Sequence, residues 1–264
     1  MTNIHGDFIW YELMTTDAEA AQDFYGRLVG WSFKDGGQSD MDYRLFSADG
    51  PQVGGVMPLS QEMQDGGARP MWAGYIGVDD VDATAQKIRS SGGTIMMEPQ
   101  DIPDVGRFAF VRDPQGVPFY IMRGLSDEPS ESFAHDAPRE GHCAWNELLT
   151  SDLDAADAFY GDCFGWVAAD SMDMGEAGPY RMYRNGEHRA SMFGAMMKRP
   201  ESGPPPIWLY YFRVPDIDEA ATFIGAHGGA VVIGPQEIPG GEYVLNGTDP
   251  QGAIFALIGK RKGA

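Results

Sequence analysis

The feature that most constrains this chain of 264 residues is an internal repeat. The stretch WYELMTTDAEAAQDFYGRLVGW at residues 10–31 has a near copy, WNELLTSDLDAADAFYGDCFGW, at residues 145–166. Over the twenty positions that start at Glu12 and Glu147, eleven residues are identical. Two stretches this similar are expected to adopt the same local structure, so the chain should contain two copies of one fold.

The repeat extends over most of the chain. Residues 72–122 align without a gap on residues 208–258, and both segments contain Gly-Gly, Ile-Pro and Asp-Pro-Gln-Gly at matching positions. This period is far longer than the roughly 20–50 residues of solenoid repeats. The pattern predicts two homologous domains in tandem, at residues 1–124 and 142–264. Between them, residues 125–141 are rich in Ser, Pro and acidic residues, which is typical of a linker.

Each predicted domain is doubled again, because a short apolar strand, an Asp, a helix and a Gly occur in that order four times. After Asp17, apolar residues recur at Ala21, Phe24, Tyr25 and Leu28, which is the spacing of one helix face. Asp at the N-cap satisfies free amide donors, and short strands with turn signals follow each helix. The sequence therefore predicts an α+β fold of four βαβββ modules. The predicted capping residues are Asp17, Asp80, Asp152 and Asp216.

Charge and composition restrict the partners and the location. The net charge of −20 disfavours nucleic acid and anionic membranes, which bind proteins through Lys and Arg. There is no apolar run of about 18 residues and no secretory signal pattern at the start, so we expect a cytoplasmic protein. Cys143 and Cys163 lack metal-type spacing and are expected to be free buried thiols.

The order of these motifs resembles one known superfamily. A strand, Asp, a helix with Phe-Tyr and then Gly-Trp are followed by a second strand, Asp, a helix, Gly-Gly, Asp-Pro-x-Gly and a last strand. This pattern is similar to the vicinal-oxygen-chelate superfamily, which includes glyoxalases, bleomycin-resistance proteins and extradiol dioxygenases. The resemblance covers almost the whole chain, twice. It implies two glyoxalase-like domains with curved half-barrel sheets around a cavity, a fold that hosts many chemistries.

The resemblance also implies where a divalent metal would bind, and those positions hold the wrong residues. A metal ion needs three or four His, Asp, Glu or Cys ligands. We therefore expect no metal and no other cofactor, although a metal is usual for the family. The implied positions are Trp10, about Gly55, Ala73 and Tyr120 in the first domain, and Trp145, about Gly194, Leu209 and Ala256 in the second.

The same positions indicate what would line the implied cavities. Strand alternation puts Glu12 on the face of Trp10, and Glu147 on the face of Trp145. Glu12 and Glu147 are the candidate catalytic residues, as a base or as a hydrogen-bond anchor. The structural alternative is that each Glu pairs with an Arg. The predicted ligand-binding residues are Trp10, Tyr75, Tyr120, Trp145, Tyr211 and Arg213.

These observations support one main functional hypothesis and two alternatives. The main hypothesis is a protein that binds or detoxifies a small organic molecule in an aromatic cavity without the usual metal. The first alternative is an active lyase or isomerase, or a dioxygenase-like enzyme, that uses Glu12 and Glu147 or relocated metal ligands. The second is an interaction protein with collapsed pockets. Either a monomer or a homodimer would satisfy the duplication.

Overall fold

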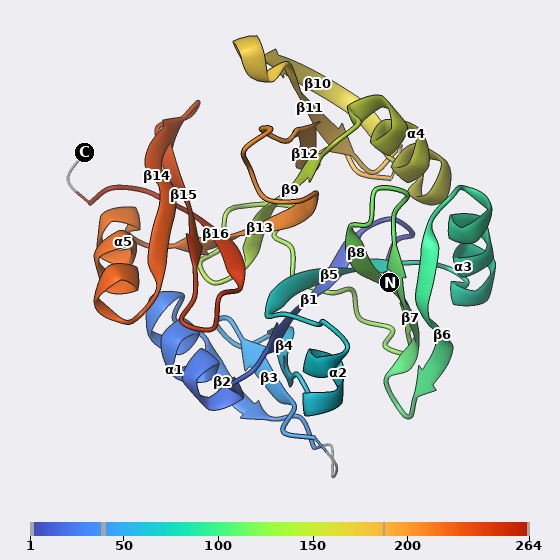
Figure 1. The fold of residues 1–264 in the computed structure, drawn as a ribbon, viewed down its shortest axis with the longest axis horizontal. Coiled ribbons are helices and arrows are strands. Elements are labelled where there is room, and N and C mark those ends of the chain that lie inside the picture. Colours follow the sequence, from blue (N-terminus) through green and yellow to red (C-terminus); the bar gives the residue numbers. More distant parts are fainter. Residues whose placement is uncertain (1–2, 38–40, 187, 263–264) are drawn as a thin grey trace. The chain divides into compact units, whose positions relative to one another are not determined.

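The computed structural model describes residues 3–37, 41–186 and 188–262 (Figure 1). Its elements follow the order βαβββ four times, which confirms the predicted α+β fold of four modules. The first module comprises β1 (Phe8–Thr15), α1 (Ala18–Leu28), β2 (Ser32–Asp35), β3 (Arg44–Ser47) and β4 (Gln52–Pro58), and a short helix α2 (Gln61–Asp65) follows it. The second comprises β5 (Met71–Gly77), α3 (Val81–Ser90), β6 (Thr94–Ile102), β7 (Gly106–Arg112) and β8 (Pro118–Gly124).

The second half of the chain repeats this series. The third module comprises β9 (Cys143–Thr150), α4 (Leu153–Phe164), β10 (Val167–Asp173), β11 (Pro179–Arg184) and β12 (Met192–Lys198), with a single 3-10 turn η1 (Gly175–Ala177) between β10 and β11. The fourth comprises β13 (Ile207–Val214), α5 (Ile217–Ala226), β14 (Ala230–Ile238), β15 (Glu242–Thr248) and β16 (Ile254–Gly259).

The strands form two eight-stranded sheets with the same topology. One sheet has the order β2-β3-β4-β1-β5-β8-β7-β6, and the other has the order β10-β11-β12-β9-β13-β16-β15-β14. In each module the first and last strands pair in parallel, and the strands joined by tight turns pair antiparallel. The sequence repeat is therefore a repeat of strand topology as well.

The four predicted aspartate caps are all formed. Each Asp sits in an extended conformation directly before its helix, and its side chain accepts a hydrogen bond from a backbone amide of the first turn. These bonds satisfy amides that have no partner within the helix, so they fix where each helix begins. The bonds run from Ala20 to Asp17 (2.9 Å), Ala83 to Asp80 (3.0 Å), Ala155 to Asp152 (3.0 Å), and Asp218 and Glu219 to Asp216 (2.9 and 3.0 Å).

The chain divides into two compact units, and each unit contains parts of both predicted domains. The first unit comprises Met1–Ile9, Gly74–Ser130 and Trp145–Trp208. The second unit comprises Trp10–Ala73, Glu131–Ala144 and Leu209–Ala264. The first unit thus holds most of the second and third modules, and the second unit holds most of the first and fourth. The domain ranges 1–124 and 142–264, with their linker, stay predictions.

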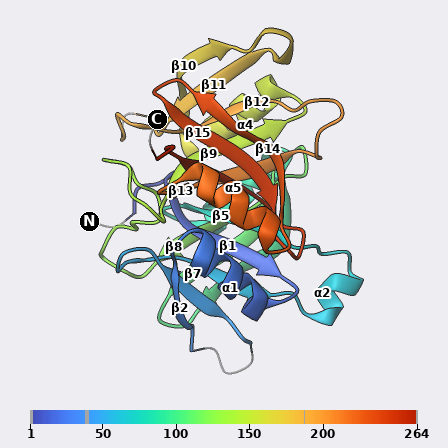
Figure 2. The same cartoon turned by 90° about the vertical axis from the view of Figure 1, so that its left-hand side faces the viewer.

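Within each unit, two helices from different halves of the chain lie side by side. In the first unit α3 lies beside α4, where Lys87 Nζ is 3.1 Å from Asp162 Oδ1. In the second unit α1 lies beside α5 (Figure 2), and the ring centroids of Phe24 and Phe223 are 5.7 Å apart. Part of the predicted linker is also buried in the second unit, because Phe133 is only 4% exposed and forms a β-bridge with Cys143.

A buried hydrogen-bond relay forms the centre of the first unit. The Tyr160 hydroxyl of α4 donates to Asp113 Oδ2 at 3.1 Å and accepts from Trp208 Nε1 at 3.0 Å. Asp113 Oδ1 accepts from the backbone amides of Gln115 and Val117, at 2.9 and 2.8 Å. One carboxylate therefore closes the Asp-Pro-Gln-Gly turn and also holds a helix from the other half of the sequence.

The second unit contains the same relay in the other copy. The Tyr25 hydroxyl of α1 donates to Asp249 Oδ2 at 3.0 Å and accepts from Trp72 Nε1 at 3.1 Å. Asp249 Oδ1 accepts from the amides of Gln251 and Ala253, at 3.0 and 2.8 Å. The repeated Phe-Tyr and Asp-Pro-Gln-Gly motifs thus belong to one buried interaction that occurs twice.

Removing the Tyr hydroxyl should destabilise the protein strongly. In Tyr160→Phe or Tyr25→Phe, a buried carboxylate oxygen and an indole N–H both lose their partner. Since each unsatisfied group costs about 1–3 kcal/mol, we expect a loss of about 2–4 kcal/mol in urea unfolding. Tyr243→Phe is the control, because its exposed hydroxyl contacts Glu237 at 3.3 Å, and its loss should cost less than about 0.5 kcal/mol. Equal losses in all three variants would contradict the relay.

The relay carboxylates should also give stability a characteristic pH dependence. Burial raises the pKa of Asp113 and of Asp249, although backbone amides and Tyr hydroxyls partly oppose it. Between the unfolded pKa of about 3.9 and the raised folded pKa, the folded state binds more protons, so this contribution to stability falls as the pH rises. A double variant, Asp113→Asn and Asp249→Asn, lacks this dependence. From pH 4 to pH 7, the unfolding free energy of the wild type should therefore fall relative to that of the double variant. The same difference between the two proteins at both pH values would contradict this prediction.

Candidate functional site

In the first unit, the predicted site residues Trp145 and Glu147 form a hydrogen-bonded cluster with Tyr180. The Tyr180 hydroxyl donates to Glu147 Oε2 at 2.8 Å and accepts from Trp145 Nε1 at 2.7 Å. Trp145 and Glu147 lie on one face of β9, as the alternation predicts, and Tyr180 reaches them from β11. Glu147 is 9% exposed, whereas Trp145 and Tyr180 are half-buried. Two partly buried aromatic residues thus stand beside a nearly buried carboxylate.

The electrostatics of this cluster fix the direction of its hydrogen bonds. Burial, followed by the negative charge of Glu147, raises the pKa of Tyr180 well above its usual range. The phenol therefore stays protonated at neutral pH and donates its proton to the carboxylate, while the indole N–H can only donate.

The second unit contains the corresponding pair, in which the Tyr43 hydroxyl donates to Glu12 Oε2 at 3.1 Å. Glu12 is 2% exposed, and strand register places Gly55 of β4 beside it. A Cβ at Gly55 would collide with the Tyr43 hydroxyl and lie 2.9 Å from Glu12 Oε1. Gly55 therefore leaves the space through which the phenol reaches the carboxylate. We call Glu12 with Tyr43, and Glu147 with Tyr180, the Tyr–Glu pairs.

Two further residues that the sequence predicts to bind a ligand form an aromatic stack in the first unit. The rings of Tyr75 and Tyr120 are 4.2 Å apart and inclined by 11°, and Phe110 lies 4.5 Å from Tyr120. The parallel pairing of β5 with β8 sets Tyr75 directly opposite Tyr120. Their exposed fractions are 7% and 4%, so most of both rings is used in packing.

The last two residues predicted to bind a ligand are Tyr211 and Arg213, which belong to β13 of the second unit. Arg213 is paired with Glu242, with Nη2 3.0 Å from Oε2 and a second contact through Nη1. This pair lowers the pKa of Glu242. Tyr211 is 5% exposed and pairs with Ala256 in the strand register. The guanidinium of Arg213 thus has a carboxylate partner within its own unit.

Tyr43 and Tyr180 belong to the Tyr–Glu pairs but were not predicted from the sequence. A signal was present, because both are the second residue of the repeated segments DYRLF and PYRMY. Their contact with Glu depends on which strand lies two places from β1 or β9 in the sheet, and the sequence does not specify that order.

The donor set does not fit the metal that the superfamily usually holds. Among residues 3–37, 41–186 and 188–262, no three or more His, Cys, Asp or Glu side chains group closely enough to bind an ion. Glu12 and Glu147, the two carboxylates nearest the implied ligand positions, each accept a hydrogen bond from a Tyr.

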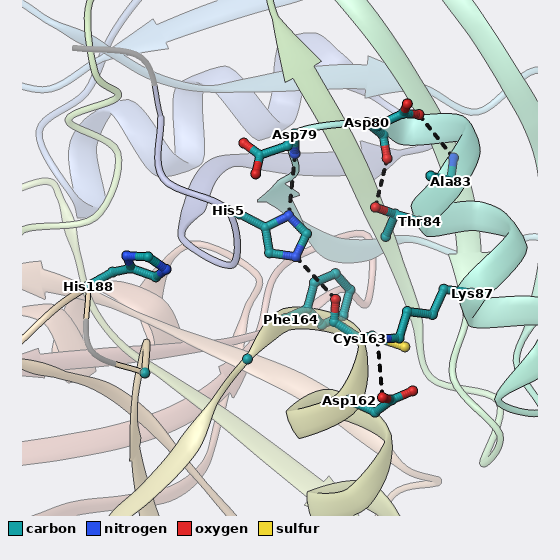
Figure 3. A pocket seen from close by; sticks show the side chains of 12 residues that line it. His5, Asp79, Asp80, Ala83, Thr84, Lys87, Asp162, Cys163, Phe164 and His188 are labelled. Atoms are coloured by element: carbon teal, nitrogen blue, oxygen red, sulfur yellow. Dashed lines mark hydrogen bonds and ion pairs between the residues drawn. The ribbon is translucent and has the colours of Figure 1, made fainter.

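A pocket of about 610 Å³ lies in the first unit, between the start of α3 and the end of α4 (Figure 3). His5 stands at its centre, where Nδ1 accepts from the Asp79 amide at 3.3 Å and Nε2 donates to the Cys163 carbonyl at 3.2 Å. Both ring nitrogens are thus used, and Lys87 is paired with Asp162. Burial raises the pKa of the Cys163 thiol to about 11, so Cys163 is not an activated nucleophile at neutral pH.

Comparison with known proteins identifies the family. The model of the Glyoxalase/Bleomycin resistance protein/Dioxygenase superfamily matches residues 8–121 and 140–257. The chain therefore belongs to this superfamily, which confirms the resemblance that its motifs indicated. In the described residues, no helix is both long enough and apolar enough to cross a membrane.

Relatives of similar length extend the comparison. A Mycobacterium bovis protein named "Putative glyoxylase CFP32" is 36% identical over 94% of this chain and 93% of its own length. Anthracycline biosynthesis protein DnrV of Streptomyces peucetius is 29% identical over 96% of this chain and 93% of its own length.

Solved structures show the same fold at low identity. The Mn(II)-bound glyoxalase of Novosphingobium aromaticivorans has a TM-score of 0.65 at 17% identity, covering 98% of this chain and 83% of its own. Homoprotocatechuate 2,3-dioxygenase of Arthrobacter globiformis has a TM-score of 0.66 at 14% identity, covering 98% and 81%.

The buried thiols predict low cysteine reactivity in the folded protein. With a pKa of about 11, Cys163 is almost entirely protonated at pH 8, and Cys143 is 1% exposed. We expect iodoacetamide to modify the native protein at least ~100-fold more slowly than a free thiol of ordinary pKa, because the thiolate is the reactive form. Both cysteines should react at the ordinary rate in urea. Rapid native alkylation of Cys163 would show that the thiol is exposed and ionised.

Proposed function

We propose that this protein binds a small organic molecule with an aromatic surface against the sheet faces that carry the Tyr–Glu pairs, without the divalent metal usual for its superfamily. One observation carries the proposal. In the first unit, a nearly buried carboxylate is fixed by a Tyr hydroxyl, and Trp145 and Tyr180 beside it are only partly buried.

The chemistry of the cluster suits a ligand that combines an aromatic ring with a hydrogen-bond donor. A carboxylate accepts hydrogen bonds at about four positions, and the Tyr180 hydroxyl occupies one of these positions on Glu147. A hydrogen bond to a charged group contributes about 1.5–3 kcal/mol. The indole and phenol rings would provide the apolar walls that small-molecule sites usually have.

The relatives support a small organic ligand. One is named as a glyoxylase and another as an anthracycline biosynthesis protein, and both match this chain over nearly its whole length. We propose that the ligand is an organic compound encountered in the cytoplasm, and that the protein acts on it by binding or detoxification as a monomer or homodimer. Turnover as a lyase, isomerase or dioxygenase stays an untested prediction.

Binding of a hydroxylated aromatic probe tests the site. Calorimetric titration with 2-naphthol, compared with 2-methoxynaphthalene, separates the hydrogen bond from the aromatic contact. Glu147→Gln should weaken 2-naphthol binding about ten-fold or more, since the charged acceptor is lost, and should leave 2-methoxynaphthalene unchanged. Glu12→Gln is the matched variant in the second unit. If neither variant changes 2-naphthol binding, or if 2-naphthol does not bind, the site assignment is wrong.

The metal content of the purified protein tests the proposal that no divalent metal is bound. Protein purified without a metal-binding tag should contain well below one equivalent of Mn, Fe, Ni or Zn by elemental analysis, because the described residues offer no group of three metal ligands. A stoichiometric metal that survives mild chelation would overturn the metal-free assignment. The 2-naphthol titration should also be unaffected by EDTA.

A further inference from the structure

We propose that only the Tyr–Glu pair of the first unit binds the aromatic ligand of the proposed function, on which this assignment rests, and that Met172 determines its specificity. The two pairs differ in what lies beside each tyrosine in its sheet. Tyr180 has side chains at the neighbouring strand positions, whereas Tyr43 has glycines there. The protein should therefore hold one ligand per chain, although its fold and its Tyr–Glu pairs occur twice.

In the second unit, the ring of Tyr43 lies across two glycines. The Gly36 backbone N–H donates to the Tyr43 carbonyl at 2.8 Å, which places Gly36 opposite Tyr43 in the β2–β3 hairpin. A Cβ at Gly36 would lie 2.5 Å from Tyr43 Cδ1, and a Cβ at Gly55 would lie 2.5 Å from Tyr43 Cζ. The phenol ring therefore fills the space that side chains would need at both positions, and it rests on the backbone of the sheet.

In the first unit, the corresponding positions carry side chains. Met172 of β10 pairs directly with Tyr180, so both side chains project from the same face of the sheet. Ala195 of β12 pairs with Glu147, and this is the position that Gly55 has in the second unit. The Cβ of Ala195 occupies the space that the tyrosine ring fills in the second unit, so the ring of Tyr180 stands away from the backbone.

The two faces also differ in what a ligand from solvent can touch. Met172 is 38% exposed, and Trp145 and Tyr180 are only partly buried, so all three residues have solvent-accessible surface. In the second unit a glycine takes the place of Met172, and Glu12 is 2% exposed, against 9% for Glu147. Of the two pairs, the one in the first unit therefore combines an accessible thioether with an indole and a phenol.

The thioether narrows the ligand class to flat aromatic rings. A methionine sulfur makes favourable contacts with aromatic rings, and the unbranched side chain adapts to their outline. The rings of Trp145 and Tyr180 offer offset or edge-to-face contacts to the same ligand. A saturated ring of equal size gains the apolar contact but not the contact with the sulfur. Met172 should therefore favour a hydroxylated aromatic compound over its saturated analogue.

Calorimetric titration of the full chain with 2-naphthol tests the stoichiometry and the role of Met172. One molecule should bind per chain. Met172→Ala should weaken binding about two- to ten-fold, the loss expected for one sulfur–aromatic contact. Met172→Leu keeps the volume, so it should weaken 2-naphthol but leave decahydro-2-naphthol unchanged. Met96→Ala is the control, because Met96 is a 46% exposed methionine on β6 of the same unit, and its loss should change neither affinity.

Methyl NMR of the wild-type protein distinguishes the two faces without depending on how any variant folds. In protein labelled with ¹³C-methyl methionine, the Met172 signal should shift on addition of 2-naphthol, because the bound ring lies beside it. Met57 reports on the second pair, since it lies two residues after Gly55 on β4 and therefore on the same face as Glu12. The signals of Met57 and Met96 should not move.

The outcomes separate this assignment from the proposed function. Weaker 2-naphthol binding in Glu147→Gln, with wild-type binding in Glu12→Gln, supports the single site. Two bound molecules per chain, a Met57 shift as large as that of Met172, or wild-type affinity in Met172→Ala would overturn the single site and leave the proposed function standing. If 2-naphthol does not bind, or if neither Glu variant changes its binding, both the single site and the proposed function are wrong.

Discussion

The fold of each compact unit depends on one buried interaction, a Tyr hydroxyl held between an Asp carboxylate and an indole N–H. In the first unit Tyr160 joins Asp113 to Trp208, and in the second Tyr25 joins Asp249 to Trp72. The carboxylate also accepts two backbone amides of its own turn. Burial of such groups is tolerated only when their hydrogen bonds are satisfied, so the turn, the helix and the strand stabilise one another in the folded unit.

The need to satisfy these buried hydrogen bonds explains what the duplication contributes to the fold. The Tyr and the Asp of each relay lie 47 and 224 residues apart in the chain, and they come from different copies of the repeat. Each copy therefore supplies the helix that the turn of the other copy needs. The duplication provides both partners within one chain, at a fixed stoichiometry, and the sheet faces that carry the Tyr–Glu pairs are built on this framework.

Much of the fold and part of the candidate site could be predicted from the sequence. The four aspartate caps and the βαβββ order followed from local patterns, because capping and strand alternation depend on neighbouring residues. Alternation also placed Glu147 and Trp145 on one face of a strand. Tyr180 was not predicted, since it reaches Glu147 from a strand that is not adjacent to β9. Arg213 was predicted as a ligand contact, but its partner Glu242 is 29 residues away and could not be identified from spacing.

The sequence by itself determined the family, the four modules and the absence of metal-ligating residue types at the implied positions. These properties depend on which residues are present and on how near neighbours in the chain are spaced, and both can be read from the sequence. Only the tertiary structure decided which carboxylate meets which phenol and which Trp shares the Tyr hydroxyl of each relay. Such contacts depend on strand order and helix packing, because a side chain's environment is set by whatever the fold brings next to it, however distant in the chain.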